Sequence, residues 1–321
     1  VITVGRYTEP QFAELMVKEG RADLVAFGRQ SLADPAMPKK ALEERLEDMT
    51  PCIACLQGCV ANMYAGNPIC CLTNPFLGHE AEPIAKTENP KKVMVIGGGV
   101  AGLCVAFIAK EKGHEVTLYE AGDVLGGNMR LAAYPPGKGD ITNMIRSYIH
   151  RCQKDGVKIV MNCEVTPELI KEEKPDSVII ATGSKTLILP IEGIDNPAII
   201  HGSDLLDGKR PAGKKVLVVG GGMVGCETAA FLGEQEHDVT VIEFRDTVGA
   251  DVIHEHRVYL MKDFEDYGIK EITGAKVCKF YEDGVEYETA DGQRHESRGY
   301  DSVILSMGFR NYNPFGEEIK A

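Results

Sequence analysis

The chain has 321 residues, of which 44% are hydrophobic and 26% are charged. This is enough for two or three ordinary domains with buried cores, and it excludes a small disulfide-stapled module or a largely disordered chain. The net charge of -13 argues against a nucleic-acid partner and against a surface that seeks anionic lipid.

The cysteine count indicates a reducing compartment. Ten cysteines are present and no secretory signal opens the chain, so clustered thiols should serve metals or redox chemistry rather than disulfides. The longest uncharged apolar stretch, Val93–Ala109, is short for a bilayer span and carries four glycines, which favours a strand, turn and helix. We therefore expect a cytoplasmic protein without a membrane partner.

The first residues predict two βα units. An apolar strand, Val1–Gly5, precedes a helix over Pro10–Glu19, and a second strand, Ala22–Gly28, precedes a charged helical stretch around Lys39–Glu47. Two parallel strands cannot close a barrel or cover a sheet, so we expect the chain to begin inside a larger domain.

Five cysteines crowd into the next segment. Cys52, Cys55, Cys59 and Cys71 have the spacing C-x2-C-x3-C-x11-C, and four thiolates can hold either zinc or an iron-sulfur cluster. Three cysteines within eight residues and a distant fourth are unlike the paired knuckles of a zinc ribbon. An electron-carrying [4Fe-4S] centre is therefore favoured over structural zinc, and Cys70 is the rival for the fourth position.

A glycine turn follows the next apolar strand. Gly97, Gly99 and Gly102 stand in G-x-G-x-x-G register, which allows a tight turn, close approach of a pyrophosphate, and close packing of helix on strand. Glu120 lies 23 residues past Gly97, where a carboxylate would accept hydrogen bonds from ribose hydroxyls. The pattern predicts a dinucleotide site.

The same design recurs 123 residues later, so two dinucleotides are expected. Its residues are Gly220, Gly222, Gly225, Glu227 in the first turn of the helix, and Glu243 at the end of the next strand. The Glu243 carboxylate would accept from a free 2′-hydroxyl and repel a 2′-phosphate, which favours NADH over NADPH. Arg245 lies close enough to bind such a phosphate, so NADPH stays the alternative.

The region from about Lys92 to Gly308 resembles the two-dinucleotide-binding flavoproteins, in which an FAD domain carries an inserted NAD(P)H domain. The motif Ala181, Thr182, Gly183 after an apolar strand and the stretch Gly221–Ala229 carry this resemblance. It implies that the first motif runs close to the flavin and that further FAD contacts come from Gly126, Gly127 and Arg130. Neither unit has the paired cysteines of a dithiol reductase of the glutathione or thioredoxin type.

The order of all parts resembles a narrower family, the iron-sulfur flavoenzymes of the 2,4-dienoyl-CoA reductase, enoate reductase and trimethylamine dehydrogenase group, related to old yellow enzyme. In that group an FMN-binding TIM barrel precedes a cysteine segment of this spacing. The resemblance implies that the FMN phosphate is held by Gly5, Arg6, Gly28 and Arg29. It also implies that the catalytic residues and the substrate pocket lie upstream of Val1.

The resemblance divides the chain into five segments. They are the end of the FMN barrel (1–51), the iron-sulfur segment and linker (52–90), the FAD domain (91–187), the NAD(P)H domain (188–308) and a truncated return to the FAD domain (309–321). The predicted fold class is thus α/β, with the last two βα units of a TIM barrel, a [4Fe-4S] cysteine segment and two Rossmann-like domains.

The function implied is that of a fragment of an NADH-dependent ene-reductase. Electrons would pass from NADH through FAD, [4Fe-4S] and FMN to an activated C=C bond of an unsaturated acyl-CoA, an enoate or an oxo-steroid. The alternatives are an amine dehydrogenase of the trimethylamine dehydrogenase type and a non-catalytic electron-transfer subunit. The intact second glycine motif disfavours the former, and the exposed edges of two isolated βα units disfavour the latter. Expected partners are a nicotinamide dinucleotide and a small substrate, and a homo-oligomer is compatible with the sequence.

Overall fold

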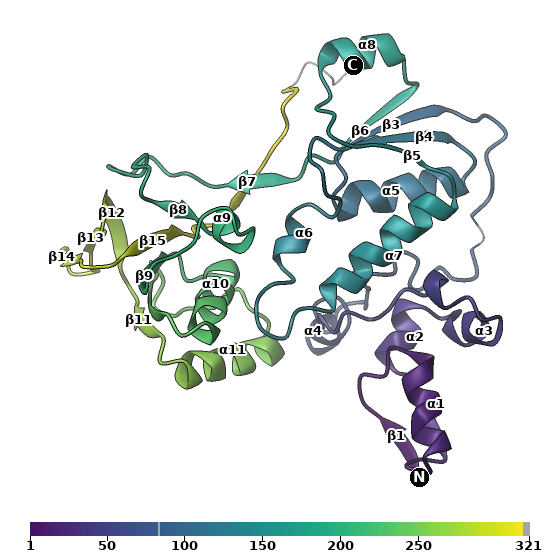
Figure 1. Ribbon diagram of the computed structural model, residues 1–321, viewed down its shortest axis with the longest axis horizontal. Coiled ribbons are helices and arrows are strands. Elements are labelled where there is room, and N and C mark those ends of the chain that lie inside the picture. Colours follow the sequence, from purple (N-terminus) through teal and green to yellow (C-terminus); the bar gives the residue numbers. More distant parts are fainter. Residues whose placement is uncertain (83, 317–321) are drawn as a thin grey trace. The chain divides into compact units, whose positions relative to one another are not determined.

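The computed structural model describes residues 1–82 and 84–316, which form two compact units (Figure 1). Unit 1 contains Val1–Ala133, Gly139–Gly183 and residues 313–316, and unit 2 contains Tyr134–Lys138 and Ser184–Tyr312. The end of the predicted segment 309–321 lies outside the described residues, because 317–321 are not among them.

Unit 1 begins with two βα units. Strand β1 (Ile2–Val4) pairs in parallel with β2 (Leu24–Ala26), and helix α1 (Pro10–Lys18) connects them. Pro10 occupies the start of the helix, where its missing N–H has no intrahelical partner to lose. Short helices then follow in the order α2 (Arg29–Ala33), α3 (Met37–Leu42), η1 (Leu46–Asp48, a 3-10 helix) and α4 (Val60–Tyr64).

The rest of unit 1 is built on a four-stranded parallel sheet in the order β5-β4-β3-β6. Its strands are β3 (Lys92–Ile96), β4 (Glu115–Tyr119), β5 (Lys158–Val160) and β6 (Ser177–Ile180). Its helices are α5 (Val100–Glu111), α6 (Asn128–Leu131), α7 (Ile141–Lys154) and α8 (Pro167–Glu173). Four consecutive apolar residues of β3 are buried, as a central strand covered on both faces requires.

Unit 2 repeats this design with a five-stranded parallel sheet in the order β11-β10-β9-β15-β8. Its strands are β8 (Ile200–His201), β9 (Lys215–Val219), β10 (Asp238–Ile242), β11 (Lys270–Ile272) and β15 (Ser302–Leu305). Its helices are α9 (Gly202–Leu206), α10 (Met223–Glu234) and α11 (His254–Asp266).

Two smaller antiparallel sheets complete unit 2. One contains β12 (Lys276–Tyr281), β13 (Gly284–Glu288) and β14 (Arg294–Ser297), and the other pairs β7 (Ser184–Thr186) with β16 (Phe309–Asn311). The mixed α/β class with parallel sheets is therefore confirmed. Within the part of the chain that the structure describes, no helix combines the length and the apolar character that crossing a bilayer needs.

Candidate functional site

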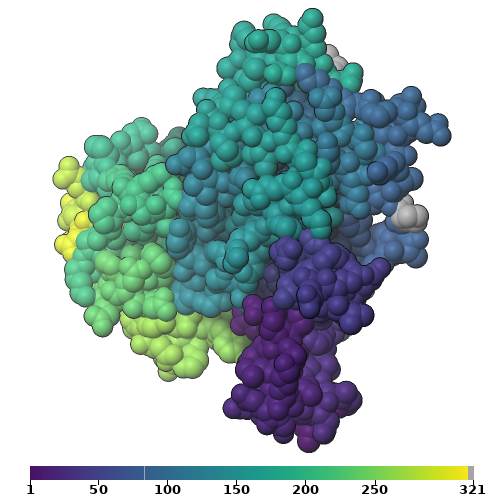
Figure 2. Space-filling view, turned by 45° about the vertical axis from the view of Figure 1, so that its right-hand side comes forward, coloured from purple at the N-terminus to yellow at the C-terminus, as the bar shows by residue number. Residues whose placement is uncertain are grey.

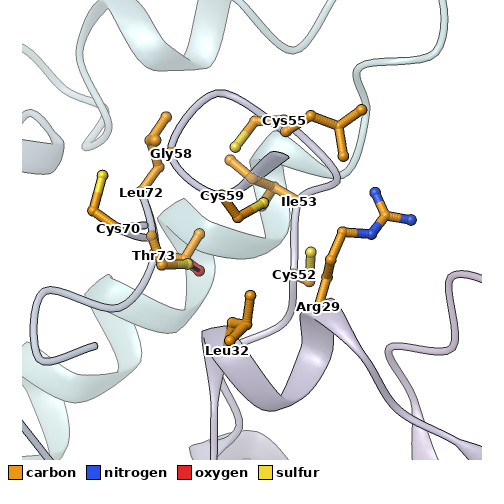
Figure 3. A pocket seen from close by; sticks show the side chains of 12 residues that line it. Arg29, Leu32, Cys52, Ile53, Cys55, Gly58, Cys59, Cys70, Leu72 and Thr73 are labelled. Carbon is orange, nitrogen blue, oxygen red and sulfur yellow. Dashed lines mark hydrogen bonds between the residues drawn. The ribbon is translucent and has the colours of Figure 1, made fainter. Parts of the chain in front are cut away.

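The predicted cluster ligands line one cavity in unit 1. Cys52, Cys55, Cys59 and Cys71 all contribute to its wall, together with Cys70 (Figure 3). Burial raises the pKa of the Cys52 and Cys55 thiols, and charge on the neighbouring thiols acts in the same direction. All ten cysteines of the chain are free thiols.

The two adjacent cysteines, Cys70 and Cys71, occupy different surroundings. Cys71 is half-buried, its Sγ lies 3.3 Å from Thr73 Oγ1, and its charge acts on both Cys52 and Cys55. Cys70 is exposed, and Figure 3 shows its sulfur apart from those of the cysteines at 52, 55 and 59. The Cys70 backbone instead packs on Gly58, where its N–H donates to the Gly58 carbonyl at 2.8 Å.

The backbone between the first two cysteines adopts an unusual conformation. Ala54 and Leu56 both have positive φ angles, 52° and 57°, which non-glycine residues adopt at a cost and mainly at functional sites. The Ala54 N–H donates to Cys52 Sγ at 3.4 Å. Alternating left-handed residues turn backbone N–H groups toward one side, an arrangement that suits anionic groups, iron-sulfur clusters included. Among residues 1–82 and 84–316, no three His, Cys, Asp or Glu side chains form a group that would hold a single metal ion.

A second pocket adjoins the cysteine cavity. It brings together the four residues predicted to hold the FMN phosphate, Gly5, Arg6, Gly28 and Arg29. Arg29 and Cys52 line both spaces, so one arginine and one cysteine form the shared wall. The Arg6 guanidinium is paired with the carboxylate of Asp140.

The first glycine turn has the close contacts that its spacing predicts. A Cβ on Gly97 would lie 2.3 Å from the Ala181 carbonyl, and one on Gly102 would lie 1.9 Å from the Gly97 carbonyl. Neither position can accept a side chain. Gly99, by contrast, has no atom nearer than 4.0 Å to such a Cβ, which leaves room at the N-terminus of α5 for an approaching group.

The acid at the end of β4 is held against this turn. Glu120 accepts hydrogen bonds from the N–H groups of Gly98 and Gly122, each at 2.7 Å. The carboxylate therefore lies at the edge of the glycine turn, where ribose hydroxyls would meet it.

The remaining predicted FAD residues belong to the same unit. Gly126 donates its N–H to the Gly98 carbonyl at 2.8 Å and forms a bridge with Gly99. Gly127 precedes α6, which carries Arg130. The motif Ala181, Thr182, Gly183 follows β6, with the Ala181 N–H donating to Ile96 at 2.8 Å.

The second glycine turn reproduces this geometry in unit 2. A Cβ on Gly220 would lie 2.4 Å from the Ser306 carbonyl, and one on Gly225 would lie 1.8 Å from the Gly220 carbonyl. Glu243 accepts from the Gly221 N–H at 2.6 Å and from the Arg245 N–H at 3.0 Å. The second turn differs from the first at Gly222, where the atoms nearest to an added Cβ belong to Asp251. The Asp251 carboxylate accepts a hydrogen bond from the Met223 N–H at 2.8 Å.

Glu227 is buried in α10, 8% exposed, and is paired with Lys138 of the segment Tyr134–Lys138. Burial raises the pKa of the Glu227 carboxyl, and the Lys138 ammonium acts in the opposite direction. Lys138, Asp251 and the buried Gln30 of α2 were not predicted from the sequence. Each reaches its partner across 22 to 89 residues of chain, and no motif marks it.

Each of the two parallel sheets has a glycine turn that leads into a helix, and an acid at the end of the next strand. Together they define an α/β oxidoreductase fold with two Rossmann-like halves. Residues 91–320 match the family described as pyridine nucleotide-disulphide oxidoreductase, and the chain belongs to that family. Residues 1–48 match the NADH:flavin oxidoreductase / NADH oxidase family. The two matches, in this order, confirm the resemblance drawn from the sequence.

Among similar proteins is the NADH oxidase of Thermoanaerobacter brockii, 37% identical over 100% of this chain and 50% of its own length. The cinnamate reductase of Clostridium sporogenes is 32% identical over 100% of this chain and 48% of its own length. A solved complex of 2-naphthoyl-CoA reductase with 2-naphthoyl-CoA has a TM-score of 0.91 and 35% identity over 96% of this chain and 47% of that chain. The chain thus spans about half the length of the curated relatives it matches.

Proposed function

We propose that this chain carries the electron-input part of an NADH-dependent reductase that acts on an activated carbon-carbon double bond. NADH would bind at the second glycine turn, FAD at the first, a [4Fe-4S] cluster in the cysteine cavity, and the FMN phosphate in the adjoining pocket. Bound flavins accept electrons in pairs and can release them singly, which lets a two-electron donor feed a one-electron carrier.

The observation that carries this proposal is the shared wall of the two N-terminal pockets. Arg29 and Cys52 line both the cysteine cavity and the pocket at Gly5 and Gly28. A cluster in one pocket and the phosphate end of FMN in the other would be neighbours, which supports a transfer of single electrons between the two groups. The sequence alone indicated two separate motifs, and the residues that line both pockets support the proposal that the two groups are neighbours.

The residues present fit the four groups. In both glycine turns the positions that pack on backbone exclude a side chain, whereas Gly99 stays open to a pyrophosphate. The cysteine cavity offers soft thiolate donors, a backbone N–H directed at Cys52 Sγ, and a loop whose left-handed residues favour an anionic group. Cys71 fits the fourth ligand better than Cys70, because it shares the electrostatic surroundings of the others. The spacing and the cavity favour a cluster over structural zinc.

The N-terminal βα units expose apolar surface that a larger barrel would cover. In residues 1–28, five large hydrophobic side chains are at least half exposed. This segment belongs to the purple region at the bottom of Figure 2. The five side chains are those of Val1, Ile2, Val4, Phe12 and Leu24. Exposed apolar patches of this kind mark packing interfaces, and residues 1–48 match an FMN-enzyme family. We take these elements as the last two βα units of an FMN barrel.

The relatives indicate the substrate class. Cinnamate and 2-naphthoyl-CoA, named in two similar proteins, each carry a carbonyl group conjugated to carbon-carbon unsaturation. An enoate, or an unsaturated or aromatic acyl-CoA, is therefore favoured over an oxo-steroid as the proposed substrate. The residues that contact it would lie outside this chain. None of the ten cysteines forms a disulfide, which supports a reducing location, and we take this location to be the cytoplasm.

The test is a cofactor analysis of the anaerobically purified holoprotein. We expect FAD and FMN, iron and acid-labile sulfide in cluster proportions, and bleaching of the flavin absorbance when NADH is added. Zinc without iron would contradict the electron relay. Bound ADP in place of FAD, with no bleaching by NADH, would favour the amine dehydrogenase instead.

A further inference from the structure

Gln30 is a buried amide of α2 that reaches the start of the cysteine segment. It is the second residue of α2, directly after Arg29, and its side chain is only 2% exposed. The pocket predicted for the FMN phosphate includes it in its wall. A buried polar side chain of this size must find hydrogen-bond partners inside the protein.

Both ends of the Gln30 amide bind the chain that leads into the cysteine segment. Oε1 accepts from the Cys52 N–H at 2.8 Å, and Nε2 donates to the Thr50 carbonyl at 3.1 Å. The residue between them is Pro51, which has no N–H to offer. The amide therefore makes hydrogen bonds to both the Thr50 carbonyl and the Cys52 N–H. A carboxylate lacks the donor and an ammonium lacks the acceptor, so neither could make both hydrogen bonds.

Further contacts fix the backbone and the hydroxyl of Thr50. The Thr50 N–H donates to Asp34 Oδ2 at 2.9 Å, and the Thr50 hydroxyl lies 3.2 Å from Ser147 Oγ. The hydrogen bond from Cys52 to Gln30 extends this anchoring to the cysteine itself. In this way α2, which carries Arg29 in its first turn, holds the first residue of the cysteine segment directly.

We propose that Gln30 is a positioning residue for the iron-sulfur cluster, since it fixes the backbone of Cys52 at the wall shared with the flavin phosphate pocket. This inference rests on the proposed function. The orientation of Cys52 also determines whether the Ala54 N–H reaches the sulfur, and hydrogen bonds to cluster sulfurs set the reduction potential. Gln30 would thus influence both how firmly the cluster is held and at which potential it is reduced.

The test compares three variants of the holoprotein. Gln30→Met keeps the length of the side chain and removes both hydrogen bonds, whereas Gln30→Glu keeps an acceptor for the Cys52 N–H and loses the donor to Thr50. Gln153→Met makes the same change at an exposed glutamine of α7 and is the control. The measurements are the EPR spectrum and midpoint potential of the reduced cluster, and the rate at which a chelator in air bleaches it.

We expect Gln30→Met to bleach about 10-fold faster than the wild type, the lower end of what the loss of an outer ligand-orienting group costs. Its midpoint potential should move, and Gln153→Met should match the wild type in every measurement. Gln30→Glu should bleach at an intermediate rate. If Gln30→Met does not incorporate iron, the comparison of Gln30→Glu with Gln153→Met tests the positioning role by itself.

Two failures are distinguishable. A wild-type protein without the EPR signal of a reduced cluster would refute the proposed function. A wild-type protein with that signal, and Gln30 variants whose potential and bleaching rate equal those of Gln153→Met, would refute the positioning role alone.

Discussion

At the scale of single residues, adjacent cysteines allow a matched comparison. Cys71→Ser should remove most of the iron, because Cys71 lies with the other three thiols, whereas Cys70→Ser should leave the iron in place, because Cys70 is exposed and its sulfur lies apart. The measurement is iron and acid-labile sulfide per protein after anaerobic purification. Iron loss in Cys70→Ser with retention in Cys71→Ser would make Cys70 the fourth ligand.

Glu243 allows a second residue-scale prediction. Glu243→Gln removes the charge that would repel a 2′-phosphate, so the ratio of kcat/KM for NADH over NADPH should fall roughly 10-fold, or about 1.4 kcal/mol. Steady-state reduction of the flavin by each dinucleotide measures the ratio. Glu120→Gln makes the same change at the equivalent acid of the first glycine turn and should alter flavin retention without altering this ratio. An unchanged ratio in Glu243→Gln would mean that Arg245 or another group selects the dinucleotide.

Single residues of the candidate sites also show what the sequence could and could not predict. The glycine turns and their acids were predictable because strand, turn and helix are neighbours in the chain and the acid sits at a fixed spacing. The ion pair of Lys138 with Glu227 joins residues that are 89 positions apart in the sequence, and the hydrogen bond of Gln30 with Cys52 joins residues that are 22 positions apart. Neither belongs to a spaced motif, so only the folded chain reveals them.

At the scale of elements, η1 is tied to α7 through one carboxylate. Asp48 accepts hydrogen bonds from Arg45 at 2.8 Å, from His150 at 3.0 Å and from Lys154. Burial alone would raise the pKa of the Asp48 carboxyl, but these three partners outweigh it and hold the pKa well below its usual range. A depressed carboxyl pKa contributes stability that is present above the unfolded pKa of about 4 and is lost as the pH falls below it.

The consequence is a pH-dependent variant effect. Asp48→Asn should lower the melting temperature of unit 1 at pH 7, and the difference from the wild type should shrink progressively as the pH drops below about 4. Thermal unfolding across this pH series measures it. Asp23→Asn, at a carboxylate that is 81% exposed, is the control and should change little. A difference that stays constant down to the lowest pH would show that packing rather than charge joins η1 to α7.

At the level of elements, the α/β pattern was predictable because continuous runs of apolar residues, and β-branched residues next to glycine, mark the buried strands. The short helices α2, α3 and α4 were less so. Each has six residues or fewer, which is too short for a periodic pattern, and their positions depend on contacts such as Asp34 with Lys40. Of these helices, α2 contributes Arg29 and Leu32 to the wall of the cysteine cavity. The cysteine motif was therefore predictable from the sequence, but the surroundings of the cavity were not.

At the scale of the whole molecule, each unit has its own hydrophobic core. The clusters around Leu103 and Phe107 and around Met94 and Tyr119 belong to unit 1, and those around Val218 and Leu217 belong to unit 2. A chain of this kind is expected to unfold in more than one step, because each core can be lost separately.

Separate cores lead to a ligand prediction. A molecule that binds only the folded form of one unit stabilises that unit by about 2.7 kcal/mol at 100 times its dissociation constant. ADP-ribose carries the part of NADH that the second glycine turn would bind, without the reactive ring. It should therefore raise the melting temperature of unit 2 and leave that of unit 1 unchanged, as followed by calorimetry of the flavin-loaded protein. Gly225→Ala, whose Cβ would lie 1.8 Å from the Gly220 carbonyl, should abolish the shift, whereas Gly139→Ala, with no atom within 4 Å of an added Cβ, should keep it. A shift confined to unit 1 would reverse the assignment of the two dinucleotides, because ADP-ribose would then bind at Gly97 and Gly99 in preference to Gly220 and Gly222.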